Sequence, residues 1–402
     1  MEVVKLQTIF LPKRKTIVVI AGLFVILIAI LIFRQYLRRN IQIVILGYND
    51  LGMHCIQPDY SNFLILPPGN NIIVQIFEKS STSKLLTDGI IVKYKINSQD
   101  DPTKYTNSWV YADKYGYNVP EGLGITGNSL EGFMKLDSTK RYWEASAVPV
   151  TSKTGGTGPA TPYQTATITV LDKQSNKVLA EFNKLVVPVS PEMDCLNCHQ
   201  RWPNILIDHD EGEGTKLYSD SLKGILHRCN ECHADPILDQ PGKPQVPALS
   251  LAMHGFHADK MTTKIQPVCY NCHPGLITDC NRGVMRANNL GCENCHGNMR
   301  QVANSIKSGR TPWLQELGCE KCHNPKYKVN HGQLYRRSYL LNGPSPKMDN
   351  KILCATCHNG PHAEWPSLLR LDNILPKTYQ GEGTYIKKCT VCHLSRSGRV
   401  HQ

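Results

Sequence analysis

This chain has almost no cysteine outside one repeated motif. Of its 16 cysteines, 14 belong to seven repeats of Cys-x-x-Cys-His, and only Cys55 and Cys280 lie outside them. A disulfide framework does not need a His after each cysteine pair. A zinc site needs four ligands, usually two cysteine pairs or a cysteine pair with a His pair. The pattern therefore disfavours both a disulfide scaffold and a set of zinc knuckles.

The seven repeats lie in the second half of the chain, and each is the attachment signature of a c-type haem. The two thiols add to the two vinyl groups of one porphyrin, and the adjacent His becomes the proximal ligand of the iron. The predicted thioether residues are Cys195, Cys198, Cys229, Cys232, Cys269, Cys272, Cys292, Cys295, Cys319, Cys322, Cys354, Cys357, Cys389 and Cys392. The predicted proximal ligands are His199, His233, His273, His296, His323, His358 and His393. The sequence thus predicts seven covalent haem c groups.

A low-spin haem needs a second axial ligand, and eight His residues outside the repeats are candidates for this distal role. They are His54, His209, His227, His254, His257, His331, His362 and His401. We favour His227, which nearly adjoins a repeat, and the neighbouring pair His254 and His257. His209 lies in an acidic segment, and His401 is the penultimate residue, where chains tend to fray.

The formal net charge of +12 is divided unevenly along the chain. Residues 1–40 carry +6, residues 41–190 carry none, and residues 191–402 carry +6. A basic chain often binds nucleic acid or anionic lipid. Here the two propionates of each predicted haem would more than offset the positive charge of the last segment. No nucleic-acid partner is therefore expected.

Residues 16–33 form a run of 18 residues without a charge. A helix of that length is about 27 Å long, near the minimum for crossing a bilayer. No small-residue cleavage site follows the run, which favours an uncleaved signal anchor over a signal peptide. Because haem is attached outside the cytoplasmic membrane, we expect a single-pass protein with its haem region on the extracytoplasmic side.

Residues 41–190 lack any helix-period segment of useful length and are expected to form strands. The predicted strands are 41–46, 72–77, 90–96, 142–148, 166–171 and 178–187. Residues 191–402 hold too many repeats for a conventional apolar core, and we expect short helices and loops around the porphyrins, including a helix over 221–229. The predicted fold class is an N-terminal transmembrane helix (16–33 within 1–40), a small all-β sandwich-like domain (41–190) and a haem-packed C-terminal domain (191–402).

The segment 49–55 is unusual for a plain sandwich, because it places Met53, His54 and Cys55 side by side. One interpretation is a loop with a buried thiol, and the other is that His54 reaches a haem of the C-terminal region. Cys55 and Cys280 are also candidates for a disulfide between the two regions, which the sequence alone does not decide.

Residues 191–402 resemble the multihaem c-type cytochromes of the envelope and extracellular electron-transfer type, here in a membrane-anchored, heptahaem form. The resemblance is carried by the seven repeats, by Cys292-Glu293-Asn294-Cys295-His296-Gly297 and by Arg310-Thr311-Pro312-Trp313. It implies that closely spaced haems relay single electrons. Some catalytic relatives hold one haem through Cys-x-x-Cys-Lys, and this sequence has no such motif.

We expect an electron carrier rather than a substrate-converting enzyme. The carrier would relay electrons between membrane or periplasmic donors and further envelope or extracellular redox proteins, and a homo-oligomer is compatible with that role. Two alternatives stay open. One is an oxidoreductase with one open-site haem that acts on a small nitrogen or sulfur compound, and the other is a wire-forming cytochrome subunit.

Overall fold

The computed structural model describes residues 42–81, 83–99, 101–117, 119–152, 161–261, 268–312, 315, 334–336 and 351–394. The chain divides into two units, Met1–Gln42 and Ile43–Gln402. The second unit contains both the sheets and the repeats.

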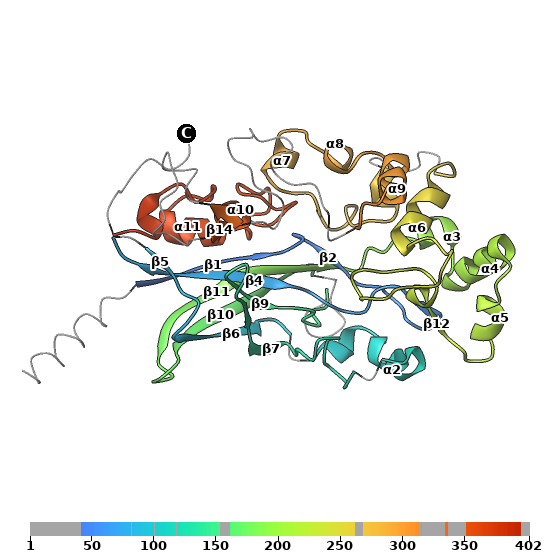
Figure 1. Cartoon of the computed structure of the whole chain (residues 1–402), viewed down its shortest axis with the longest axis horizontal. Helices are drawn as coiled ribbons and strands as arrows, with labels where there is room; N and C mark the ends of the chain where they lie inside the picture. The colour runs from blue at the N-terminus through green and yellow to red at the C-terminus, as the bar shows by residue number, and fades with distance from the viewer. Residues whose placement is uncertain are drawn as a thin grey trace, which may run out of the picture. The chain divides into compact units, whose positions relative to one another are not determined.

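The first sheet has five strands, in the order β1-β4-β9-β8 with β5 beside β4. They are β1 (Gln42–Asn49), β4 (Ile72–Lys79), β9 (Tyr142–Ala145), β8 (Lys135–Asp137) and β5 (Lys84–Leu85). β9 pairs antiparallel with both β4 and β8. The pale blue strands β1 and β4 run through the centre of Figure 1.

The second sheet also has five strands, in the order β2-β11-β10-β6-β7. They are β2 (His54–Cys55), β11 (Val178–Ser190), β10 (Tyr163–Asp172), β6 (Ile90–Ile96) and β7 (Glu131–Phe133). In β10 the side chains of Ala166, Ile168 and Val170 are fully buried, while the alternate threonines face outward. This alternation follows from the two-residue period of a strand. The predicted strands correspond to β1, β4, β6, β9, β10 and β11, and the shorter strands carried no sequence signal.

One apolar cluster joins both sheets. It contains Val74 of β4 and Ile168 of β10, and it also takes in Trp365, Leu375 and Val391 from the segment that carries the last two repeats. Side chains of the C-terminal region therefore complete the core of the sheets.

The remaining elements are short. The helices are α2 (Ser108–Ala112), α3 (Leu196–His199), α4 (Trp202–Glu213), α5 (Leu217–Ser221), α6 (Leu249–His257), α7 (Val284–Ala287), α8 (Cys292–His296), α9 (Met299–Lys307), α10 (Cys354–His358) and α11 (Ile374–Gln380). The 3-10 turns are η1 (Pro102–Tyr105), η2 (Asp113–Tyr115), η3 (Cys229–Glu231), η4 (Val268–Asn271) and η8 (Cys389–Val391). Two small pairs of strands complete the set: β3 (Phe63–Leu64) with β12 (His227–Arg228), and β13 (Leu334–Arg336) with β14 (Lys351–Leu353).

The predicted fold class is wrong as stated, and so is the predicted single-pass location. No helix within the described ranges is long and apolar enough to cross a membrane. Helix α4 has 12 residues, which span about 18 Å, against about 30 Å of hydrocarbon core. Residues 16–33, on which the anchor was predicted, lie outside the described residues.

The predicted helix over 221–229 is also wrong. Helix α5 ends at Ser221, and Gly224 follows with a φ of 79°, a backbone conformation that ends a helix. Leu226 is buried with Tyr60 and Tyr115 instead of facing a porphyrin. Residues His227 and Arg228 then form β12, which pairs with β3.

Candidate functional site

We number the predicted haem sites by their repeats along the chain. Site 1 is 195–199, site 2 is 229–233, site 3 is 269–273, site 4 is 292–296, site 5 is 319–323, site 6 is 354–358 and site 7 is 389–393. Site 5 lies outside the described residues, as do the candidate ligands His331 and His401.

The described repeats fold into single helical turns. The His amide donates to the carbonyl of the first Cys in sites 1, 2, 3 and 7, at 3.1, 3.0, 2.9 and 2.8 Å. Sites 4 and 6 coincide with α8 and α10. Residues three and four apart lie on one face of a helical turn. The spacing Cys-x-x-Cys-His therefore turns two thiols and an imidazole toward the same side.

In sites 1 and 2 a second His ring lies opposite the motif His. The centroids of His199 and His257 are 6.3 Å apart and their planes are at 84°. The centroids of His233 and His209 are also 6.3 Å apart, with planes at 85°. His257 comes from α6 and His209 from α4, so each site is completed by a helix that is distant in sequence from its motif.

Sites 3 and 4 have the same arrangement with flatter ring angles. His254 of α6 faces His273 at 6.1 Å, with the planes at 22°. His362 faces His296 at 6.1 Å, with the planes at 38°. An imidazole nitrogen binds a transition metal at about 2 Å, so two such nitrogens on opposite sides of one metal are about 4 Å apart. Ring centroids lie somewhat farther out, and the four separations fit a metal held between the rings.

Six of these eight rings form a hydrogen bond through Nδ1. The Nδ1–H group donates to a backbone carbonyl in four of them, which fixes the tautomer and leaves Nε2 for a metal. The Nδ1 partners are Asp208 Oδ2 for His199 at 2.7 Å, Thr215 Oγ1 for His209 at 2.9 Å, Pro247 O for His233 at 2.8 Å, Ser250 O for His254 at 2.7 Å, Met253 O for His257 at 2.8 Å and Leu51 O for His362 at 2.9 Å.

Burial keeps the rings of site 3 neutral. Burial lowers the pKa of His273 to about 4, with further lowering by the neighbouring His254, His296 and His362. Burial also lowers the pKa of His254. A His must be neutral to bind a metal, so the environment of this site favours the ligating form.

His54 and His227 lie in other surroundings. Nε2 of His54 is 2.6 Å from Asp50 Oδ1. Nε2 of His227 is 3.2 Å from Asp220 Oδ2, and its Nδ1 is 3.3 Å from Glu231 Oε2. Carboxylates therefore occupy the nitrogen that a haem ligand would use, and the structure brings neither ring opposite a motif His in the described chain.

The last two described sites have other neighbours. The ring of His358 in site 6 is stacked with that of Tyr385, at 5.2 Å and 17°. Nδ1 of His393 in site 7 is 3.2 Å from Ser81 O, and Leu394 N donates to Ser80 O at 3.1 Å. Site 7 is thus attached to the end of β4.

Exposed apolar side chains accompany the motifs. Leu276 and Ile277, just after site 3, are 51% and 78% exposed, and Met253 and Phe256 of α6 are 37% and 50% exposed. Contiguous exposed apolar surface usually marks a binding site. Together with the thiols and the paired imidazoles, these side chains fit an apolar macrocycle bound through its metal.

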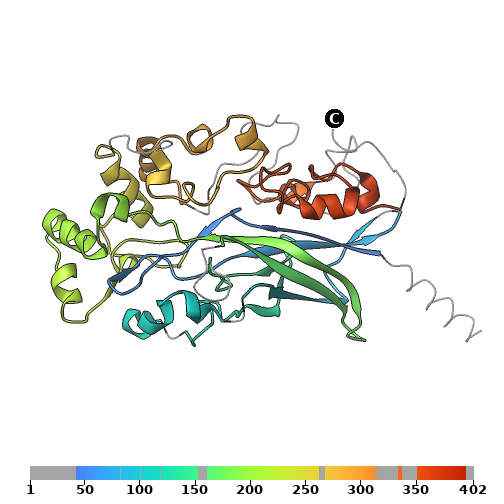
Figure 2. The same cartoon turned by 180° about the vertical axis from the view of Figure 1, so that it is seen from behind.

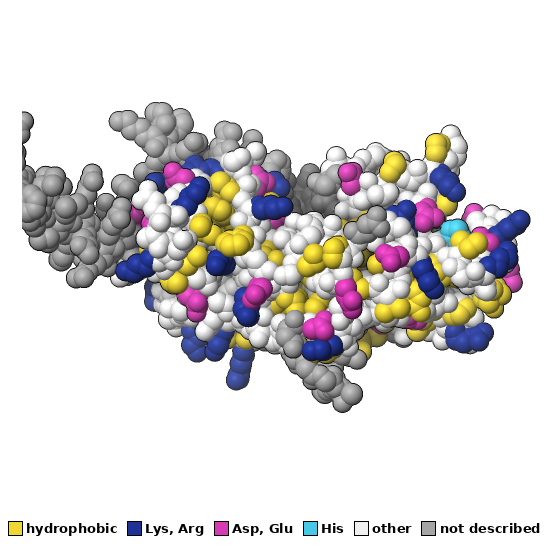
Figure 3. Space-filling model, turned by 90° about the horizontal axis from the view of Figure 1, so that it is seen from below, with side chains coloured by type: hydrophobic (Ala, Val, Ile, Leu, Met, Phe, Trp, Pro, Cys, Tyr) yellow, Lys and Arg dark blue, Asp and Glu magenta, His cyan; other side chains and the backbone are white. Residues whose placement is uncertain are grey.

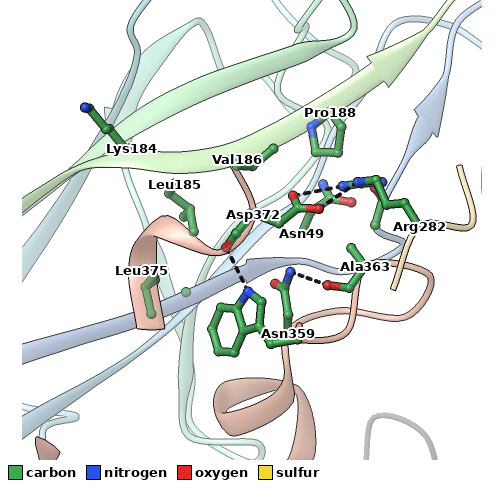
Figure 4. Close-up of a pocket in the computed structure, with 13 residues that line it drawn as sticks. Asn49, Lys184, Leu185, Val186, Pro188, Arg282, Asn359, Ala363, Asp372 and Leu375 are labelled. Carbon is green, nitrogen blue, oxygen red and sulfur yellow. Dashed lines mark hydrogen bonds and ion pairs between the residues drawn. The ribbon is translucent and has the colours of Figure 1, made fainter. Parts of the chain in front are cut away.

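A buried ion pair holds the loop that carries His362. Arg282 and Asp372 are 2% and 1% exposed, and the guanidinium binds both carboxylate oxygens, with Nε–Oδ2 at 2.7 Å and Nη2–Oδ1 at 3.1 Å (Figure 4). Nη1 of Arg282 also donates to Gly52 O at 2.7 Å. The amides of Arg282 and Gly283 donate to His362 O at 2.7 and 2.8 Å. Arg282 thereby joins the segments that contain Gly52, His362 and Asp372, and these bonds hold the loop that brings His362 to site 4.

The small cavity drawn in Figure 4 belongs to this tether. Asn49 and Leu185 line it together with the ion pair. Trp365 Nε1 donates to Asp372 O at 2.8 Å in the same place. The cavity lies between strands and the C-terminal segment and contains no motif residue.

A second buried carboxylate holds the loop after site 3. Glu192 is 2% exposed and accepts from the amides of Leu276, Ile277 and Thr278 at 2.9, 2.7 and 2.8 Å. Burial by itself raises the pKa of the Glu192 carboxyl, but these donors and the Thr278 hydroxyl outweigh it, and the pKa lies below the usual value. The charged carboxylate therefore fastens this loop to the end of β11.

Cys55 and Cys280 lie near each other. Cys55 is in register with Ser190 of β11, and the Ser190 hydroxyl is bonded at 2.8 Å to Thr278, two residues before Cys280. Burial raises the pKa of the Cys55 thiol, and the Cys280 thiol raises it further. Both are thiols in this structure.

Sequence reasoning did not find Asp208, Glu192, Arg282 or Asp372. Asp208 is nine residues from His199, and Arg282 is 90 residues from Asp372. No periodicity or motif relates residues at such separations. The chain contains many charged residues, and the sequence does not show which few of them are buried.

Comparison with known proteins gave one match. A family model described as cytochrome c7 and related cytochrome c matches residues 303–394, a segment that includes sites 5, 6 and 7. No curated protein and no solved structure matches the chain. The match extends over less than a quarter of the sequence. It supports a multihaem c-type cytochrome with covalently bound haem c and a role in electron transfer.

Proposed function

We propose that this protein is a seven-haem electron carrier that relays single electrons between other redox proteins. The observation that carries the proposal is the facing of two His rings in each of sites 1 to 4, at centroid distances of 6.1 to 6.3 Å. A haem with two axial His ligands has no coordination position open for a substrate. The arrangement supports electron transfer over catalysis at these four sites.

The chain's own residues would hold and tune the cofactor. The two cysteines of each repeat would bind the porphyrin by thioether bonds, and the motif His would be the proximal ligand. We assign the distal role to His257 in site 1, His209 in site 2, His254 in site 3 and His362 in site 4. When bound, haem supplies one-electron redox chemistry, and the axial ligands and their hydrogen bonds set its potential.

Partners are proposed to be redox proteins that bind transiently. Figure 3 shows the face on the side of α2, β6 and β7, where acidic and basic side chains are intermixed with apolar ones. Electron-transfer encounters use small, weak interfaces, which fits transient binding of such partners.

A haem count and a spin-state measurement test the proposal. The holoprotein is assayed by pyridine haemochrome and mass spectrometry. Its electron paramagnetic resonance (EPR) spectrum is recorded with and without nitrite or hydroxylamine, and the optical spectrum of the reduced protein with and without CO. Seven haems per chain are expected, and the haems of sites 1 to 4 are expected to be low-spin and unaffected by the added molecules. A high-spin component that changes with a small molecule would contradict the carrier and indicate the open-site oxidoreductase.

The distal assignments have their own control. His257→Ala should convert one low-spin haem to high-spin, because the ring lies opposite His199. His227→Ala is the matched variant, since that ring is held by Asp220 and Glu231. It should leave the spectrum unchanged. A high-spin signal in His227→Ala, but none in His257→Ala, would reverse the assignment.

A further inference from the structure

We propose that the six described sites follow one another in space in the order 2, 1, 3, 4, 6, 7, so that the first two are exchanged relative to the chain. The inference rests on the proposed function and concerns the residues that hold neighbouring sites together. Site 5 lies outside the described residues and has no place in this order.

Helix α4 joins sites 2 and 1. Its consecutive residues Asp208 and His209 reach different sites: Asp208 Oδ2 is 2.7 Å from Nδ1 of His199, and the His209 ring faces His233. Adjacent residues of a helix are a few ångströms apart, so the two sites must be neighbours.

Helix α6 joins sites 1 and 3. His254 and His257 are one turn apart, and they face His273 of site 3 and His199 of site 1. The amide of Asp194, next to site 1, also donates to Cys272 O at 3.4 Å. Site 1 therefore lies between site 2 and site 3, although site 2 separates them in the sequence.

Side chains of sites 3 and 4 touch directly. The thiols of Cys269 and Cys292 are hydrogen-bonded to each other. The helices that flank these sites, α6 and α9, pack together.

Site 4 reaches site 6 through His362. This residue is four positions after His358, and its ring faces His296. The segment between them is closed by Trp365 N donating to His358 O at 2.7 Å and by Asn359 Nδ2 donating to Ala363 O at 2.8 Å. The turn after site 6 thus supplies a ring to site 4.

Sites 6 and 7 share the segment before Cys389. Ile386 N donates to Cys357 O at 2.8 Å, and Tyr385 stacks on His358. Figures 1 and 2 show the resulting succession from opposite sides, from α4 and α5 at one end through α6 and α9 to α10 and α11 at the other.

The angles between the planes of the facing His rings allow the sites to be distinguished by EPR. Near-perpendicular imidazole planes give a strongly anisotropic low-spin EPR signal, and near-parallel planes give a rhombic one. Sites 1 and 2, at 84° and 85°, should give the first kind, and sites 3 and 4, at 22° and 38°, the second.

Two matched variants of the haem-loaded full chain test the order by redox titration followed by EPR. His257→Met and His209→Met change the distal ligand of sites 1 and 2, and Met raises the potential of a haem relative to His. The haem of the altered site is then reduced at a higher potential than its neighbours. The electron that it gains makes reduction of the nearest haems harder. His257→Met should move the rhombic signal of site 3 to lower potential, and His209→Met should leave the rhombic signals of sites 3 and 4 in place.

Every other result overturns the order. If a rhombic signal moves in His209→Met alone, site 2 lies next to site 3, as in the chain. If a rhombic signal moves in both variants or in neither, sites 1 and 2 are not exchanged. Asp208→Asn and Thr215→Val repeat the contrast if a ligand variant fails to fold. The first removes the charge of the Nδ1 partner in site 1, and the second removes the Nδ1 partner in site 2 together with its bond to Asp210. A wrong haem count, or high-spin haems at sites 1 to 4 of the wild type, would instead defeat the proposed function.

Discussion

The sheet region and the repeat region are stabilised in different ways. Among the described residues, buried apolar side chains outnumber buried polar ones by 37 to 10 between residues 43 and 190, whereas there are ten of each between 191 and 394. The sheets are held by apolar burial, which needs no specific partner. The repeat region depends on a few buried polar tethers and, we propose, on its cofactors.

The tethers connect the two regions at specific points. Arg282 joins Asp372 to Gly52, and Glu192 binds the loop after site 3. Gln75 of β4 accepts from Leu353 N at 3.1 Å and from the Thr356 hydroxyl at 2.6 Å. A buried polar group costs stability unless it is paired. Loss of one tether partner should therefore have a large effect on a region that has little apolar core.

The largest effect is expected for Arg282→Met. It leaves the Asp372 carboxylate buried and unpaired, which costs about 3–5 kcal/mol. The loop that carries His362 should loosen, so that site 4 also loses its rhombic EPR signal. Chemical denaturation of the holoprotein and EPR measure the two effects. Arg286→Met, at an exposed position six residues before site 4, is the control and should change neither. Unchanged stability of Arg282→Met would show that the ion pair is not needed.

Ile168→Ala is expected to destabilise the sheet core without touching the sites. Ile168 is fully buried in β10, and truncation of a buried Ile costs about 2–5 kcal/mol. The denaturation midpoint should fall, while haem content and the EPR spectrum stay as in the wild type. A change in the spectrum equal to that of Arg282→Met would remove the distinction between the two regions.

Glu192→Gln tests a charge-dependent tether. At neutral pH the loss of the carboxylate should cost about 1–3 kcal/mol. Because the pKa of Glu192 is lowered in the folded state, its contribution is present above the unfolded value of about 4.3 and is lost as the pH falls through the folded pKa. The difference between wild type and variant, measured by denaturation from pH 7 to pH 3, should shrink in that window.

The control for this experiment is Glu121→Gln. Glu121 is an exposed carboxyl, and its replacement should change stability by less than about 0.5 kcal/mol. A difference for Glu192→Gln that stays constant with pH would mean that its charge is not what holds the loop.

The smallest expected effect compares two exposed apolar residues. Val110 in α2 is 73% exposed and Ile277 after site 3 is 78% exposed. Val110→Ser should change the stability of the holoprotein by less than about 0.5 kcal/mol. If the cofactor covers Ile277, Ile277→Ser should cost about 1 kcal/mol, since apolar burial is lost. Equal thermal shifts in the two variants would mean that Ile277 faces water in the holoprotein.

Much of the sheet region was predictable because its signals are local. The alternation around Ile168 and the β-branched runs gave the six long strands. The two-residue strands β2, β3 and β12 were not predictable, since two residues form a strand only when another segment supplies the hydrogen bonds. The helix expected over 221–229 failed because Gly224 ends the turn and Leu226 finds a better apolar contact with Tyr60 and Tyr115.

The choice among the candidate distal ligands shows the same limit. His227 was favoured for its position beside a repeat, yet carboxylates hold it, and His209 was discounted for its acidic surroundings, yet it faces His233. The residues next to a His in the sequence do not show which motif, on another segment, its ring will face.

The sequence by itself indicated haem c chemistry and predicted the proximal ligands, because the two thiols and the His of each repeat lie within one helical turn. Only the tertiary structure decided which His faces which motif and which charges are buried. Those relations depend on contacts between residues tens to hundreds of positions apart, such as His362 with Leu51 and Arg282 with Gly52, and they exist only when the sheets and the repeat region pack together.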